Sequence, residues 1–155
     1  MLKLEPIEIL LRGIPEGFLY ILGVYIFSKI KINRNKYITS SLITSVVICC
    51  IRFLPIDYGV HTILSILFII FFSILYNKID SIKATRATII TFIIQFLSEG
   101  INMLVLTSIP NLDLDYLFSN AVTKNFLGIP SLIVTLIVLM LFYNFYKRKD
   151  DIKDV

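Results

Sequence analysis

The sequence is poor in the residues that build metal sites and the catalytic sites of enzymes. Its 155 residues include one histidine, His61, and only two cysteines, Cys49 and Cys50, which are adjacent. Adjacent cysteines rarely bridge, so a disulfide framework is excluded, and a closed zinc site needs more ligands than one histidine supplies. The chain also has no H-E-x-x-H, phosphate-loop or G-x-S-x-G motif. We therefore expect no metal, no cofactor, no catalytic residues and no enzymatic activity.

Charged residues are scarce as well. They make up 17% of the chain, whereas 57% of the residues are hydrophobic, and a soluble domain usually has about 25% charged residues. The apolar residues are grouped in blocks long enough to cross a bilayer as helices, which takes about 20 residues. The composition therefore predicts an all-α integral membrane protein with the lipid bilayer as its main partner.

Five apolar segments predict a bundle of five transmembrane helices that forms a single membrane domain, residues 1–155. The predicted spans are residues 13–32, 37–54, 59–77, 84–107 and 129–146. The stretch 111–128 is too polar to cross the membrane, and Asp115 is a residue type that begins helices. We expect a short interfacial helix there. Its apolar side would comprise Leu117, Phe118, Val122 and Phe126.

The distribution of positive charge predicts the orientation of the chain. Residues 29–36, 77–86 and 147–155 contain eleven of the 15 lysines and arginines. Because cytoplasmic loops are enriched in these residues, the N-terminus is predicted outside and the C-terminus inside. The net charge of +4 is then an orientation signal, and no nucleic-acid partner is expected. Abundant isoleucine beside three alanines is typical of low-GC bacteria, so we expect a multi-pass protein of the bacterial cytoplasmic membrane.

The fourth predicted span carries an unusual polar stripe. Its members recur at spacings of three and four, so they fall within about 100° of the helix surface. They are Thr88, Thr91, Gln95, Ser98, Glu99 and Asn102. Such a stripe must face protein or water, which leaves two interpretations: hydrogen-bonded helix packing, or a face that lines a ligand or ion site. Ser41, Ser45 and Cys49 form a small-residue face on the second span, which predicts close helix packing.

The predicted topology places the unusual ionisable residues in the outer leaflet, although they come from four helices. The candidate ligand- or partner-binding residues are Arg12, Glu16, Arg52, Gln95, Ser98, Glu99 and Asn102, with Asp57 and His61 at the periphery. A guanidinium suits a low-dielectric pair because it stays charged and binds carboxylates with two parallel hydrogen bonds. We expect the pairs Arg52–Glu99 and Arg12–Glu16. The cluster is either a closed ion-pair network or a pocket that opens outward.

Three stretches carry a resemblance to a known family. "RGIPEGFLYILGVYIF", "RFLPIDYGVHTIL" and "QFLSEGINML" resemble the N-terminal membrane sensor region of Firmicutes histidine kinases of the accessory-gene-regulator or GHKL type. Those kinases detect extracellular peptides and continue into a dimerisation helix and an ATPase domain. The chain shows no phospho-acceptor or ATP site. The resemblance therefore implies a sensor-like module without the kinase part.

These observations favour a non-enzymatic module that recognises an extracytoplasmic ligand or a membrane partner through the outer-leaflet polar residues. The expected partner is a membrane signalling or transport protein, an extracellular peptide or small molecule, or a second copy of the chain. Two alternatives stay open. One is a small permease or transporter subunit that uses Glu99 as a cation or proton relay, and the other is a scaffold for an envelope complex.

Overall fold

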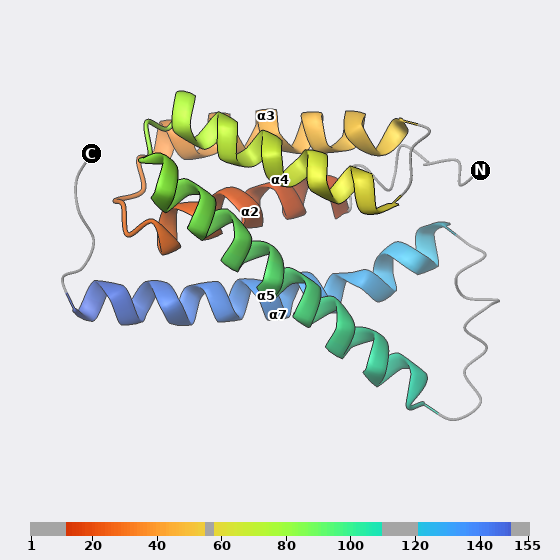
Figure 1. Cartoon of the computed structure of the whole chain (residues 1–155). Coiled ribbons are helices and arrows are strands. Elements are labelled where there is room, and N and C mark those ends of the chain that lie inside the picture. Colours follow the sequence, from red (N-terminus) through yellow and green to blue (C-terminus); the bar gives the residue numbers. More distant parts are fainter. Residues whose placement is uncertain (1–11, 55–57, 110–120, 150–155) are drawn as a thin grey trace.

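The computed structural model describes residues 12–54, 58–109 and 121–149 and is all-helical within these ranges. The helices are α2 (Ile14–Phe27), α3 (Arg34–Phe53), α4 (Tyr58–Leu75), α5 (Ser81–Thr107) and α7 (Ala121–Arg148). Successive helices run in opposite directions along the bundle (Figure 1). The described chain therefore begins at one end of the bundle and finishes at the other. The all-α class predicted from the sequence is confirmed for these residues.

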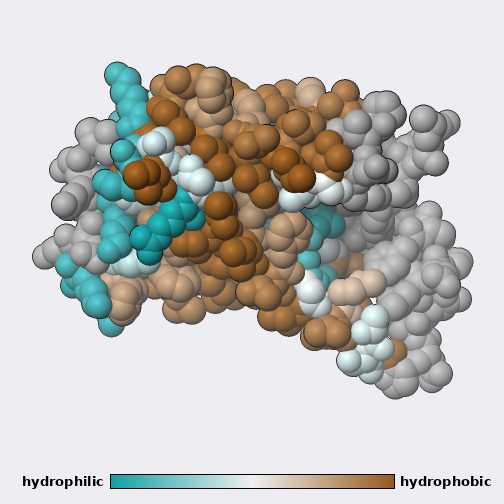
Figure 2. Space-filling view, viewed as in Figure 1, coloured by the Kyte–Doolittle hydropathy of each residue, from teal (hydrophilic) through white to brown (hydrophobic). Residues whose placement is uncertain are grey.

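Three of the described helices are long and apolar enough to cross a membrane: α3, α5, and α7 from Phe126 onward. The apolar helices α2 and α4 are shorter. At 1.5 Å per residue, the 14 residues of α2 extend about 21 Å, against about 30 Å for a bilayer core. Figure 2 shows hydrophobic surface over the middle of the bundle and hydrophilic residues gathered at one end. Large exposed apolar side chains of this kind indicate a membrane protein.

Helix α2 is the centre of the bundle. It contacts α3, α4, α5 and α7, and residues 19–26 are all buried. A helix that is hydrophobic on all sides is expected to be enclosed by others. Two glycines let neighbouring helices come close: a Cβ on Gly17 would lie 2.1 Å from Ser45 Oγ, and a Cβ on Gly23 would lie 2.3 Å from Thr91 Oγ1. The predicted small-residue face of α3 is confirmed at this contact.

Local hydrogen bonds explain why α2 and α3 differ in length from the predicted spans. Lys29 has a left-handed backbone (φ 56°), and the amide of Ile30 donates to the carbonyl of Tyr25 over 3.2 Å. This pattern ends a helix, so α2 stops at Phe27 and not at residue 32. The Asn33 side chain then accepts a hydrogen bond from the amide of Lys36. That cap starts α3 at residue 34, before the predicted residue 37.

The last helix begins earlier than predicted. α7 runs from Ala121 through Pro130 to Arg148, and it bends along its length in Figure 1. An internal proline removes a helical hydrogen bond and accounts for a bend. Residues 121–128 are therefore the first turns of α7, so the prediction that they belong to a separate interfacial helix is wrong. Asp115, Leu117 and Phe118 lie outside the described residues.

Candidate functional site

Two ion pairs lie near the end of the bundle where α2 begins and α3 finishes, and they involve α2, α3, α5 and the residue just before α2. Arg52 Nη2, in the last turn of α3, lies 2.6 Å from Glu16 Oε1 in the first turn of α2. Arg12, just before α2, pairs with Glu99 of α5. A Cβ on Gly128 of α7 would lie 3.1 Å from Arg12 Nη1. We call Arg12, Glu16, Arg52, Gln95 and Glu99 the charged cluster.

The pairs are the reverse of those expected from the sequence. Arg12–Glu16 and Arg52–Glu99 were the predicted pairs, and both predictions are wrong. Arg12 and Glu16 would be neighbours on a regular helix that contained both, but α2 begins only at Ile14. Arg12 instead extends beside Gly128 and reaches the carboxylate of Glu99. Arg52 of α3, and not Arg12, is therefore the cation beside Glu16.

Glu16 is the most enclosed charged group of the cluster. Its side chain is 3% exposed, whereas that of Arg52 is 33% exposed. The hydroxyl of Tyr20 donates to the same Glu16 oxygen, Oε1, over 2.8 Å. Oε2 of Glu16 has no hydrogen-bond partner within the described parts of the chain. The buried carboxylate is thus neutralised from one side and keeps one oxygen able to accept a further hydrogen bond.

The second pair is linked to the interior of the bundle by a series of side chains. Nε2 of Gln95 donates to Glu99 Oε1 over 3.1 Å, and Thr135 Oγ1 of α7 lies 2.9 Å from Gln95 Oε1. Gln95 and Thr135 are buried, but Arg12 and Glu99 keep 25% and 34% of their side chains exposed. The cluster therefore has an accessible edge and a buried, hydrogen-bonded base.

The other described residues that we predicted for the site make hydrogen bonds within or between helices, outside the charged cluster. Asn102 Nδ2 donates to the carbonyl of Leu127 over 2.7 Å and joins α5 to α7. Ser98 is buried and donates to Ile94 of its own helix. Nδ1 of His61 lies 2.7 Å from the carbonyl of Ile51, which places His61 against the end of α3. Asp57 lies outside the described residues.

The part of the polar stripe that precedes Gln95 in α5 is a helix-packing surface. Thr88 and Thr91 are buried, and each hydroxyl donates to the carbonyl four residues earlier, on Ala84 and Ala87. Thr91 also lies at the point where α5 packs closely against Gly23 of α2. Helix packing therefore accounts for the two threonines, whereas Gln95 and Glu99 of the same stripe belong to the charged cluster.

Sequence reasoning missed three residues that support the cluster. Tyr20 follows Glu16 by four residues, a spacing that predicts contact on a helix, so this signal was present. Thr135 and Gly128 lie on α7, and their contacts depend on how α7 packs against the other helices. No local pattern indicates such a contact. Within the described ranges, no three histidine, cysteine, aspartate or glutamate side chains are grouped as metal ligands would be.

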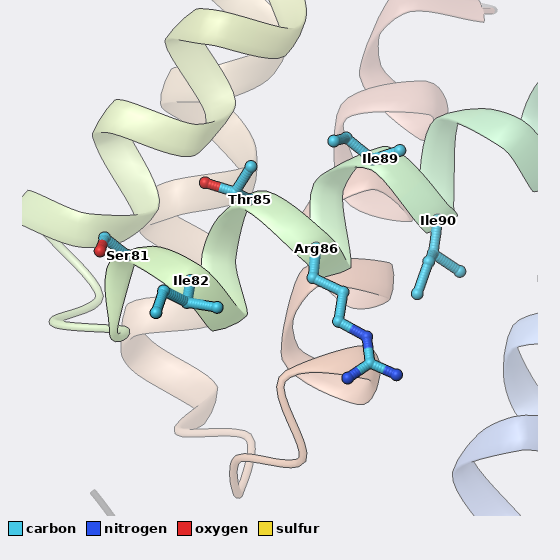
Figure 3. A pocket seen from close by; sticks show the side chains of 6 residues that line it. All are labelled: Ser81, Ile82, Thr85, Arg86, Ile89 and Ile90. Atoms are coloured by element: carbon cyan, nitrogen blue, oxygen red, sulfur yellow. The ribbon is translucent and has the colours of Figure 1, made fainter.

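A surface hollow lies on the first half of α5 (Figure 3), and none of its lining residues belongs to the charged cluster. It is lined by Ser81, Ile82, Thr85, Arg86, Ile89 and Ile90. Arg86 is the one charged residue among them. Ligand sites usually combine an enclosed cavity with several convergent polar groups. This hollow lacks that arrangement, so the charged cluster is the better candidate site.

Comparison of the chain with protein-family models, with curated proteins and with solved structures finds no match.

Proposed function

We propose that the protein is a non-enzymatic, multi-pass membrane module that recognises an extracytoplasmic ligand or membrane partner through the charged cluster. The observation that carries this proposal is the convergence of two ion pairs from α2, α3, α5 and the residue before α2, each pair with a partly exposed member. Ion pairs in a membrane domain are expensive, and well-packed apolar residues often replace buried pairs at no cost in stability. Their presence favours a role beyond holding the helices together.

The proposal includes five spans, with the N-terminus outside and the C-terminus inside. α2 and α4 are short for a bilayer, but local thinning and flanking charged residues accommodate short spans. Lysines and arginines gather at the end of the bundle opposite the cluster. In the described chain they are Lys29, Lys31, Arg34, Lys36, Lys78, Lys83, Arg86, Lys147, Arg148 and Lys149. By the positive-inside rule, that end would lie in the cytoplasm. The membrane would be the bacterial cytoplasmic membrane, as the composition suggests.

Unused hydrogen-bonding capacity suggests how a ligand would be held. Nε of Arg12 and Oε2 of Glu16 are buried atoms without a partner among the described residues. One is a donor and the other an acceptor. A charged group on the ligand would compete for Arg12 or Glu99 at the accessible edge. Arg12 and Arg52 would meet anionic groups, and Glu16 and Glu99 cationic ones.

The test is a ligand screen by thermal stability on the purified protein in lipid nanodiscs. The panel comprises anionic, cationic and zwitterionic peptides and small molecules. We expect a charged compound to raise the Tm of the wild type, because a ligand that binds only the folded state stabilises it. The shift should be lost in Glu99→Gln and kept in Lys147→Gln, which removes a charge at the other end. A Glu99→Gln protein that fails to insert or accumulate would show a structural role and remove the proposal's main support.

A permease or transporter subunit is the second candidate, and the hydrogen-bonded series Glu99–Gln95–Thr135 favours it. Intramembrane carboxylates joined to polar side chains are typical of proton and cation pathways. Proton or cation flux into proteoliposomes that contain only this protein, lost in Glu99→Gln, would favour transport. If the cluster tolerates substitution in both assays while the apolar surfaces do not, the envelope scaffold is the better explanation.

A further inference from the structure

We propose that the end of the bundle opposite the charged cluster binds the phosphate of an anionic phospholipid headgroup. The site is a surface hollow lined by residues 30–36 together with Tyr25 and Asn77, and we call it the basic hollow. It lies where α2 ends, α3 begins and the loop between α4 and α5 passes. This inference does not depend on the proposed recognition function, because the two sites share no residue.

Three cations line the basic hollow: Lys31, Arg34 and Lys36. The loop between α4 and α5 contains one acidic residue, Asp80. Its carboxylate accepts hydrogen bonds from the amides of Ile82 and Lys83 and so caps α5. Each lysine or arginine near a membrane surface adds attraction for anionic lipid. The charge of the hollow therefore favours an anion over a neutral headgroup.

The first turn of α3 forms one wall of the hollow. The amides at the start of an α-helix have no intrahelical acceptor, and the helix dipole makes that end positive. Asn33 caps the amide of Lys36, while Arg34 and Asn35 come first in the helix, where amides bind phosphate well. A 20-residue helix supplies a full dipole at this wall.

An unpartnered side chain gives an independent indication of a ligand. Asn77 lines the hollow and is 3% exposed. Its Oδ1 accepts a hydrogen bond from the hydroxyl of Tyr25 over 2.9 Å, but its Nδ2 has no acceptor within the described residues. A buried amide donor without an acceptor is unfavourable. A phosphate oxygen held in the hollow would supply that acceptor.

The experiment measures the Tm of the full-length protein in neutral detergent with three additives: phosphatidylglycerol, phosphatidylcholine and inorganic phosphate. We expect phosphatidylglycerol to raise the Tm with a saturable dose dependence and phosphatidylcholine to have little effect. In the triple variant Lys31→Gln/Arg34→Gln/Lys36→Gln, the phosphatidylglycerol concentration that gives half of the maximal Tm shift should rise about tenfold or more. A matched control, Lys147→Gln/Arg148→Gln/Lys149→Gln, removes the same charge at the same end and should retain it.

Asn77→Asp separates the specific site from general surface charge. It keeps an oxygen for Tyr25 but replaces the unpartnered donor with an acceptor, so phosphatidylglycerol should protect it less. An equal shift with inorganic phosphate, lost in the same variants, would support the phosphate site with a soluble ion as its source. Equal losses in the two triple variants, or no effect of phosphatidylglycerol on the wild type, would overturn the proposal. If Asn77→Asp does not fold, the comparison of the triple variants decides.

Discussion

Arg52 and Glu16 are 36 residues apart in the chain, yet the guanidinium of one lies 2.6 Å from the carboxylate of the other. The contact fixes the C-terminal end of α3 against the first turn of the central helix, α2. Because Glu16 is almost fully enclosed and Arg52 is one-third exposed, the two members of the pair should respond differently to substitution. This asymmetry leads to the first prediction.

Arg52→Gln should lower the free energy of unfolding by about 2 kcal/mol, because it leaves the Glu16 carboxylate buried without its cation. The double variant Glu16→Gln/Arg52→Gln should recover about 1 kcal/mol of that loss, since a neutral amide no longer needs a counter-charge. Reversible unfolding in mixed micelles measures both. A double variant less stable than Arg52→Gln alone would contradict a buried, charge-paired Glu16.

Gly17→Ala should be destabilising because the added methyl group would lie 2.1 Å from Ser45 Oγ and 2.9 Å from Ser45 backbone atoms. Overpacking of this kind costs about 1–3 kcal/mol. Gly100→Ala is the control, since nothing lies within 4 Å of its added Cβ. The control should gain about 0.5–1 kcal/mol from the better helix propensity of alanine. Equal effects of the two substitutions on Tm would show that α2 and α3 are not in close contact at Gly17.

Thr135→Val should cost about 1–2 kcal/mol, because it removes a buried hydroxyl that lies 2.9 Å from Gln95 Oε1 and 2.9 Å from the carbonyl of Ser131, and so leaves Gln95 Oε1 without this contact. Thr88→Val is a matched control: Thr88 is also buried, and both hydroxyls lie within hydrogen-bond distance of the carbonyl four residues earlier, but the Thr135 hydroxyl in addition contacts Gln95 of another helix. The control should change the stability little. Unfolding of the two variants in the same micelles makes the comparison, and a Thr88→Val loss as large as that of Thr135→Val would exclude a special role for the link between α5 and α7.

Lys78→Gly should stabilise the protein by about 0.5–1 kcal/mol, because Lys78 has a left-handed backbone that glycine adopts at no steric cost. Lys83→Gly provides the control, since Lys83 is an exposed residue in the first turn of α5, where glycine costs up to about 1 kcal/mol. Thermal unfolding should therefore move in opposite directions for the two variants. A lower Tm for Lys78→Gly would show that the loop between α4 and α5 has another conformation.

The sequence predicted the helical class and the stretches that form the helices well, because runs of apolar residues and capping side chains are local signals. The burial of Thr88, Thr91 and Gln95 followed from the same periodicity. The pairing of Arg12 with Glu99 could not be predicted in this way. It depends on where α2 begins and on how α7 passes beside Arg12, and both are set by packing between distant segments. The early start of α7 was missed because residues 121–128 are too polar to look like part of a span.

We propose that the charged cluster faces the extracytoplasmic side, with its partly exposed residues Arg12 and Glu99 accessible there. Labelling of single cysteines by a membrane-impermeant maleimide tests it most directly, in a Cys49→Ala/Cys50→Ser background. Glu99→Cys probes the cluster, Thr107→Cys marks the same end of α5, and Lys147→Cys marks the other end of the bundle. We expect Glu99→Cys and Thr107→Cys to be labelled in intact cells and Lys147→Cys to be labelled only after permeabilisation. Labelling of Lys147→Cys in intact cells, with the other two protected until permeabilisation, would contradict it.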